Sequence, residues 1–163
     1  DAPAAEVGGV DRNHLAPAMG LAIWTIPPGP EVLDTLLEQV RPVTVYLFAP
    51  PPGVEDTEAF LGRLAGLLKY AVNHREGQAG YAELAAATGQ REITVRRGLA
   101  WLIENGTLKL LRERPDDFVV GLGTSVKDPA SAARTRAEIQ SLLAETGAYR
   151  AHFRRAEAGA LIH

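Results

Sequence analysis

Two short apolar runs flank a segment of helical periodicity in the first third of the chain. Residues 21–26 and 43–48 are apolar, and the second of these runs is β-branched and aromatic, which favours buried strands. Between them lies an apolar stripe with the spacing of one helix face, at Val32, Leu33, Leu36, Leu37 and Val40. Pro30 suits the first turn of this helix, and Pro42 stops it. Strand, helix and strand in this order predict a right-handed crossover and a small parallel sheet.

A helix, a tight turn, a second helix and a hairpin are predicted in the middle of the chain. A longer helix begins near Thr57, and its apolar face consists of Phe60, Leu64, Leu67, Leu68 and Ala71. A short helix from Tyr81 then leads into Gly89, where a positive φ is cheap. A helix over residues 91–104 and two β-rich segments at 107–111 and 118–122 follow. This order predicts a winged helix-turn-helix, a module that binds DNA or a partner protein.

The last part of the chain has helical patterning. Asp128 is a candidate cap for a helix that begins with Pro129, and Gly147 is a candidate stop for that helix. A final short helix carries Tyr149 and Phe153 on one face. The fold class expected is α+β, with a small parallel α/β element followed by a winged helix-turn-helix and a helical C-terminal extension. The predicted domains are residues 1–53 with an N-terminal arm, 54–125 and 126–163.

Composition narrows the classes of chemistry. The 163 residues include no cysteine, so disulfides and thiolate metal sites are excluded. The four histidines share no metal-ligand spacing, and no phosphate-binding glycine loop or rigid pair of carboxylates is visible. The net charge is −3, but residues 91–114 carry six basic residues against three acidic ones. This positive field is local and more modest than that of a dedicated DNA-binding domain.

The predicted recognition helix and wing supply the first set of candidate binding residues. Gln90 and the start of the helix would face bases or a partner, and the wing would contact phosphates. The candidates are Arg91, Thr94, Arg96, Arg97, Lys109, Arg112 and Arg114. The competing interpretation is a folded domain whose solvated face carries these charges, as in winged helices that serve for protein contact.

A second set of candidates lies on the last predicted helix. Aromatic and basic side chains alternate there, at Tyr149, Arg150, Phe153, Arg154 and Arg155. One interpretation is an aromatic pair packed on the core with arginines in water. The other is a basic, partly apolar notch that accepts an acidic peptide with an aromatic or apolar end.

The order of these features resembles the C-terminal accessory domain of some bacterial RecJ proteins, which are single-strand-specific 5′ exonucleases. The resemblance runs through Val10-Asp-Arg12, the strand and helix at 23–37, the strand at 42–48, and the segments 60–70 and 84–108. Ser141-Leu-Leu143 followed by Ala148-Tyr-Arg-Ala-His-Phe153 is similar to the closing helix of that domain.

The resemblance implies a parent enzyme that uses Mn²⁺ or Mg²⁺ in an Asp-His-His core. That motif does not occur in this chain, so the resemblance implies a non-catalytic docking piece without a metal or cofactor of its own. It also implies partners such as the acidic tail of single-strand-binding protein or a helicase, weak binding of single-stranded DNA, and a cytoplasmic, nucleoid-associated location. The alternative is a DNA-binding transcription regulator of winged-helix type, and no residues support a self-contained enzyme.

Overall fold

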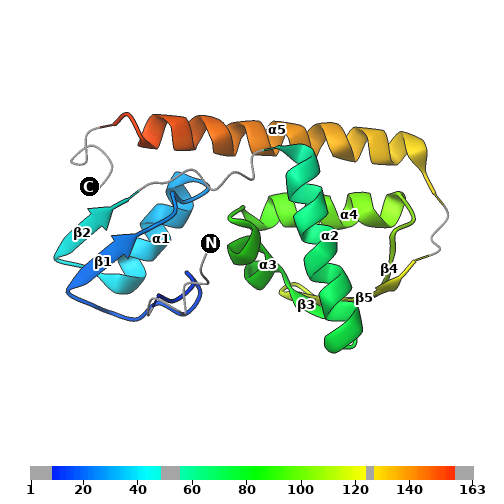
Figure 1. Cartoon of the computed structure of the whole chain (residues 1–163), viewed down its shortest axis with the longest axis horizontal. Coiled ribbons are helices and arrows are strands. Elements are labelled where there is room, and N and C mark those ends of the chain that lie inside the picture. Colours follow the sequence, from blue (N-terminus) through cyan, green and yellow to red (C-terminus); the bar gives the residue numbers. More distant parts are fainter. Residues whose placement is uncertain (1–8, 49–55, 124–126, 157–163) are drawn as a thin grey trace.

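The computed structural model, which describes residues 9–48, 56–123 and 127–156, contains two hydrophobic clusters that share one long helix (Figure 1). Helices accompany a two-stranded parallel sheet and a three-stranded antiparallel sheet, so the chain is of the α+β class. We refer to residues 9–48 as the first lobe and to residues 56–123 as the second lobe.

The first lobe is the predicted strand, helix and strand. It consists of β1 (Gly20–Ile23), α1 (Pro30–Val40) and β2 (Thr44–Leu47), and the two strands pair in parallel. The helix starts at Pro30 as predicted and ends where Arg41 adopts a left-handed conformation with φ of 50°. Side chains from one face of the sheet and from α1 form the smaller cluster, which includes Leu21, Ile23, Ile26, Leu33 and Val40.

The second lobe begins with α2 (Thr57–His74). Asp56 is its cap, because a carboxylate oxygen of Asp56 accepts a hydrogen bond from the backbone N–H of Ala59 at 2.8 Å. The helix therefore begins at Thr57, as predicted, and its cap is the residue before. A short strand that the sequence did not reveal, β3 (Gln78–Gly80), follows α2.

The predicted pair of helices follows as α3 (Tyr81–Thr88) and α4 (Glu92–Glu104). Gly89 closes α3 with φ of 65°, which confirms the expected turn. The two predicted strands form as β4 (Leu108–Glu113) and β5 (Asp117–Leu122), and the antiparallel sheet has the order β3-β5-β4. A register shift between Leu110 and Arg112 marks a bulge in β4.

The core of the second lobe lies between α2, α3, α4 and one face of this sheet. Its fully buried members include Phe60, Leu64, Leu68, Val95 and Phe118. Helices α2 and α4 approach closely at Gly98, where an added Cβ would lie 2.5 Å from Leu64 Cδ2. This contact explains why a glycine stands in the middle of α4.

Helix α5 (Pro129–Phe153) begins as predicted, since Asp128 caps it through the backbone N–H of Ser131 at 3.0 Å. The predicted stop at Gly147 is wrong, because α5 continues through this residue to Phe153. Thr146 and Arg150 are buried on either side of it. Their packing outweighs the cost of a helical glycine, which is about 1 kcal/mol.

Helix α5 belongs to both clusters. Ile139 and Leu143 pack into the core of the second lobe, whereas Tyr149 and Phe153 pack with the first lobe. Figure 1 shows α5 running along both lobes, with α2 crossing it at a steep angle. The predicted domain boundaries after residues 53 and 125 lie outside the described residues. No helix in the described ranges is long and apolar enough to cross a membrane.

Candidate functional site

Helix α4, the predicted recognition helix, is covered by α5 along one side. Arg91 donates to Glu145 Oε2 at 2.8 Å, and Arg97 Nε lies 3.0 Å from Glu138 Oε2. At the other end of α4, Ser131 Oγ donates to Glu104 Oε1 at 2.8 Å. These contacts run in opposite order along the two helices, so α5 lies antiparallel to α4. Acidic side chains of α5 therefore occupy the places that an acidic or phosphate partner of Arg91 and Arg97 would take.

Two candidates at the start of α4 are not surface residues. Thr94 and Gln90 are fully buried, so neither side chain is available to a base edge or a partner. The expectation that Thr94 binds a ligand was wrong, because Thr94 lies on the face of α4 that packs into the core. Thr94 lies three residues from both Arg91 and Arg97 and so shares a side of the helix with them, but its short side chain is buried at the edge of the core.

Arg96 takes part in a structural network. Its guanidinium lies 3.6 Å from the centre of the Tyr81 ring and donates to the backbone carbonyl of Pro115. Tyr81 in turn donates to Glu113 Oε1 at 2.7 Å. Burial, followed by this hydrogen bond, raises the pKa of Tyr81 to about 12. Arg96 therefore connects α4 to the β4–β5 hairpin, and its removal would affect folding as well as binding.

The C-terminal candidates do not form the predicted notch. Arg150 is 2% exposed and Phe153 is 3% exposed, so the expectation that both bind a partner was wrong. Arg150 donates to the carbonyl oxygens of Ile26 and Gly89, and Phe153 packs into the smaller cluster. Tyr149 is half-buried beside Phe153, with ring centres 6.1 Å apart.

Burial, together with the nearby charges of Asp34 and Glu31, raises the pKa of Tyr149. Arg154 and Arg155 are exposed at the end of the helix, and Arg155 Nε donates to the carbonyl oxygen of Ala151 at 2.9 Å. Of the five predicted residues, only these two arginines are fully at the surface.

The three basic candidates of the hairpin gather on the solvent side of the antiparallel sheet. Lys109 stands opposite Gly121 and Arg112 opposite Val119, and directly paired residues project from the same face. Arg112 and Arg114 each lie 4.0 Å from a carboxylate oxygen of Asp117. We call this surface the outer sheet face; its residues are Gln78, Gly80, Lys109, Leu111, Arg112, Arg114, Asp117, Val119 and Gly121.

The outer sheet face is partly apolar. A Cβ at Gly121 would lie 3.0 Å from Lys109 Cε and 3.5 Å from Leu111 Cδ1, so both side chains extend over this glycine. Leu111 is 57% exposed. Lys109 makes no ion pair with any residue that the structure describes. A free cation next to an exposed leucine suits a ligand that combines a carboxylate with an apolar group.

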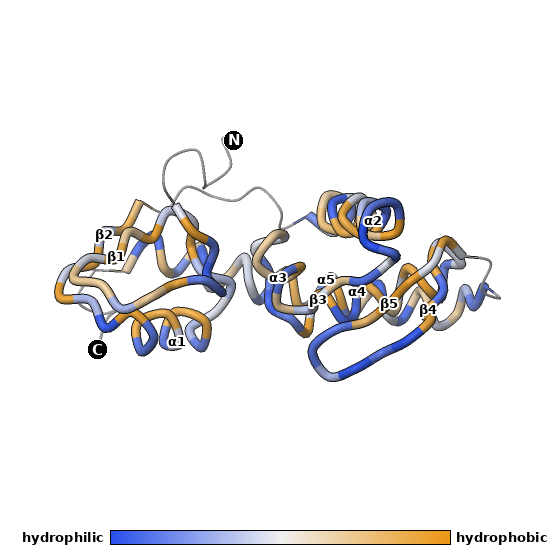
Figure 2. The backbone as a smooth tube through the Cα atoms, turned by 90° about the horizontal axis from the view of Figure 1, so that it is seen from below, coloured by the Kyte–Doolittle hydropathy of each residue, from blue (hydrophilic) through white to orange (hydrophobic). Residues whose placement is uncertain are grey.

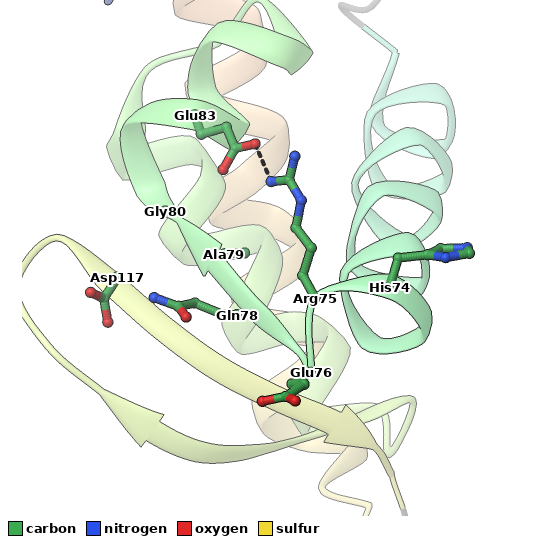
Figure 3. Close-up of a pocket in the computed structure, with 8 residues that line it drawn as sticks. All are labelled: His74, Arg75, Glu76, Gln78, Ala79, Gly80, Glu83 and Asp117. Atoms are coloured by element: carbon green, nitrogen blue, oxygen red, sulfur yellow. Dashed lines mark hydrogen bonds and ion pairs between the residues drawn. The ribbon is translucent and has the colours of Figure 1, made fainter.

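A pocket of about 600 Å³ adjoins this surface and shares Asp117, Gln78 and Gly80 with it (Figure 3). Arg75 reaches from the end of α2 toward Glu83 on α3, and their side chains meet at 2.5 Å. This hydrogen bond is the main cause that raises the pKa of Arg75. In Figure 3, His74 points away from the other side chains that line the pocket.

The outer sheet face carries side chains that could bind an acidic ligand. Within residues 9–48, 56–123 and 127–156, no group of three or more histidine or acidic side chains is placed to hold a metal ion. Guanidinium groups can bind a carboxylate through two hydrogen bonds, and apolar contact with the exposed leucine beside them would lengthen the lifetime of the complex.

Sequence reasoning missed Asp117, Leu111 and the acidic pair of α5. Asp117 lies just before the predicted strand segment 118–122, but it begins β5. A signal was present for Glu138 and Glu145, because seven residues separate them and place them on one helix face. Comparison with protein-family models, curated protein sequences and solved structures finds no match for this chain.

Proposed function

We propose that this chain is a non-catalytic docking and regulatory domain of a RecJ-like single-stranded-DNA exonuclease that acts in DNA repair and recombination. The order α2-β3-α3-α4-β4-β5 and the sheet order β3-β5-β4 support a winged helix-turn-helix as its central module. The parent enzyme would supply the Mn²⁺- or Mg²⁺-dependent chemistry, in the cytoplasm and close to the nucleoid.

The observation that carries the proposal is the cover of α5 over α4. A winged helix that reads DNA inserts the N-terminal part of its second helix into the major groove. Here Glu145 and Glu138 of α5 already engage Arg91 and Arg97 on that helix. Insertion would require α5 to leave, and α5 carries core residues of both lobes. This favours protein docking over direct base readout.

The outer sheet face is the docking surface that this proposal favours. Lys109, Arg112 and Arg114 are exposed there beside Leu111. Such a surface complements an acidic segment that ends in an apolar residue, as in the acidic tail of single-strand-binding protein. A helicase with an exposed acidic patch is a second partner of the same chemistry.

The test is a titration of the acidic C-terminal peptide of single-strand-binding protein, labelled with a fluorophore and followed by anisotropy. The Arg112→Ala/Arg114→Ala variant should bind about tenfold more weakly than the wild type. Arg154→Ala/Arg155→Ala removes the same charge from a distant surface and should leave affinity unchanged. If both variants bound the peptide equally weakly and their melting curves were unchanged, the loss of affinity would come from net charge alone. The outer sheet face would then not be the docking surface.

The second candidate function is a winged-helix transcription regulator. The element order around α3 and α4 favours it, and the exposed arginines of the β4–β5 hairpin suit phosphate contacts. A regulator reads a defined duplex sequence, whereas a docking domain does not. Selection of bound sequences from a random duplex pool separates the two functions.

A further inference from the structure

The first lobe carries an aromatic surface on the outer face of its parallel strand pair. Trp24 follows β1 and is 66% exposed, whereas Tyr46 in β2 and Phe48 after it are each 57% exposed. The rings of Trp24 and Phe48 lie with centres 5.1 Å apart, so they form one continuous patch. We call Ala22, Trp24, Tyr46 and Phe48 the aromatic face.

Only the opposite face of this sheet is covered by the described part of the chain. Leu21 and Ile23 point inward and pack against Leu33 and Val40 of α1. In Figure 2, α1 lies on one side of β1 and β2, and no labelled helix lies on the other. Parallel strands occur almost only in sheets that are covered on both faces.

The outward positions also lack the charged side chains that are common on a face that meets water. Gly20, Ala22 and Thr44 are the exposed strand positions beside Tyr46, and none of them is charged. Exposed apolar patches of this kind mark sites of interaction on soluble proteins. Within residues 9–48, 56–123 and 127–156, no layer of the α/β arrangement covers the aromatic face.

We propose that the aromatic face docks one amphipathic helix of a partner protein. Helices are the layer that normally covers parallel strands. Two strands about 4.8 Å apart present a strip roughly as wide as one helix, whose diameter is about 10 Å. The partner helix would bury an apolar stripe at i, i+3, i+4 and i+7 on Trp24, Tyr46 and Phe48.

Area and charge disfavour two other occupants. Aromatic side chains bury about 150–250 Å² each, so three that are little more than half exposed offer on the order of 350 Å². A stable dimer needs about 800 Å² from each copy, so this face is too small for a permanent dimer and suits a transient contact with a partner helix. Single-stranded nucleic acid needs basic residues along its backbone, and the aromatic face contributes none.

The test uses a designed, neutral peptide of leucine, glutamate and lysine, about four turns long, with one leucine stripe. Its binding to the full chain should shift the emission of Trp24 to shorter wavelength, and calorimetry should give a measurable Kd. Tyr46→Thr should weaken binding about tenfold. Tyr70→Gln removes an aromatic ring that is equally exposed on α2, and it should leave binding unchanged.

Several results would overturn the proposal. These are absence of binding, equal binding of a peptide with the same composition but no stripe, or equal effects of both variants. A dimer that Tyr46→Thr dissolves in sedimentation equilibrium would assign the face to a second copy, and quenching of Trp24 by oligo(dT) would assign it to nucleic acid. Arg112→Ala/Arg114→Ala should not affect helix binding, so this proposal and the proposed function fail separately.

Discussion

The Nε atom of Arg150 in α5 donates a hydrogen bond to the carbonyl oxygen of Ile26 at 3.2 Å. The same guanidinium donates to the carbonyl oxygen of Gly89, at the turn between α3 and α4. One buried side chain therefore joins α5 to the loop after β1 and to the second lobe. This role explains why an arginine is 2% exposed in a short chain.

Arg150→Ala should lower the free energy of unfolding by about 2–4 kcal/mol, because it leaves buried carbonyl groups without a charged donor and opens a cavity. Arg154→Ala, four residues further along at an exposed position, should change it by less than about 0.5 kcal/mol. Urea unfolding followed by circular dichroism measures both. A loss below about 1 kcal/mol for Arg150→Ala would show that the lobes are joined by other contacts.

The close approach of α2 and α4 gives a second prediction. Gly98→Ala should destabilise the protein by about 1–2 kcal/mol, because its new Cβ would lie 2.5 Å from Leu64 Cδ2 and 3.0 Å from Phe60 Cε1. Gly66→Ala in α2 meets no atom within 4 Å and should stabilise the protein by up to about 1 kcal/mol. Thermal unfolding of the two variants gives the comparison. Stabilisation by both would mean that the helices separate freely at Gly98.

Local signals in the sequence predicted those elements that depend on their own residues. Pro30 and Asp128 mark the beginnings of α1 and α5, and Gly89 marks the turn between α3 and α4. The strand β3 was missed because its three residues are defined by pairing with β5, which lies 37 or more residues away in the chain. Propensity within a three-residue window carries no information about such a partner.

The candidate sites were harder to predict than the fold, because burial depends on what another element covers. Thr94 and Arg97 lie one helical turn apart, yet one is in the core and the other reaches α5. Arginine is a residue type that usually lies at the surface, but Arg150 is buried in the core. Its burial follows from α5 continuing through Gly147, which a local reading of that glycine does not reveal.

The phenol of Tyr81 predicts a loss of stability in alkaline solution. Burial, followed by the hydrogen bond to Glu113, raises its pKa from 10.0 to about 12. The folded state holds this proton more tightly than the unfolded state, so the stabilisation is complete below about pH 10 and is lost as the pH rises toward 12. Unfolding free energies of the wild type should therefore fall more steeply above pH 10 than those of Tyr81→Phe. Parallel curves for the two proteins would contradict the assignment.

The proposed lack of catalysis is tested directly. The purified chain with Mn²⁺ should leave 5′-phosphorylated single-stranded DNA intact, because the proposed docking piece does not carry the Asp-His-His motif of the parent enzyme. Gel electrophoresis of labelled DNA over several hours gives the readout, with added commercial exonuclease as the positive control. The non-catalytic assignment would be rejected if DNA degradation persisted after the protein was purified again with the chromatography columns in a different order.

Binding of nucleic acid by the outer sheet face should be weak, indifferent to sequence and sensitive to salt. If Lys109, Arg112 and Arg114 each contact one phosphate of a single strand, affinity should fall about twentyfold between 50 and 200 mM salt, at a slope of roughly 0.7 per contact. Arg112→Ala/Arg114→Ala should reduce that slope to about a third, since one contact is left. Arg97→Ala should leave it unchanged, because Arg97 is paired with Glu138 of α5. Anisotropy of labelled oligo(dT) across a salt series measures all three proteins.

A different result would favour the second candidate function. If the wild type bound one duplex sequence tightly at physiological salt and Arg97→Ala abolished that binding, α4 would be a base-reading helix. The chain would then be a transcription regulator and not a docking domain.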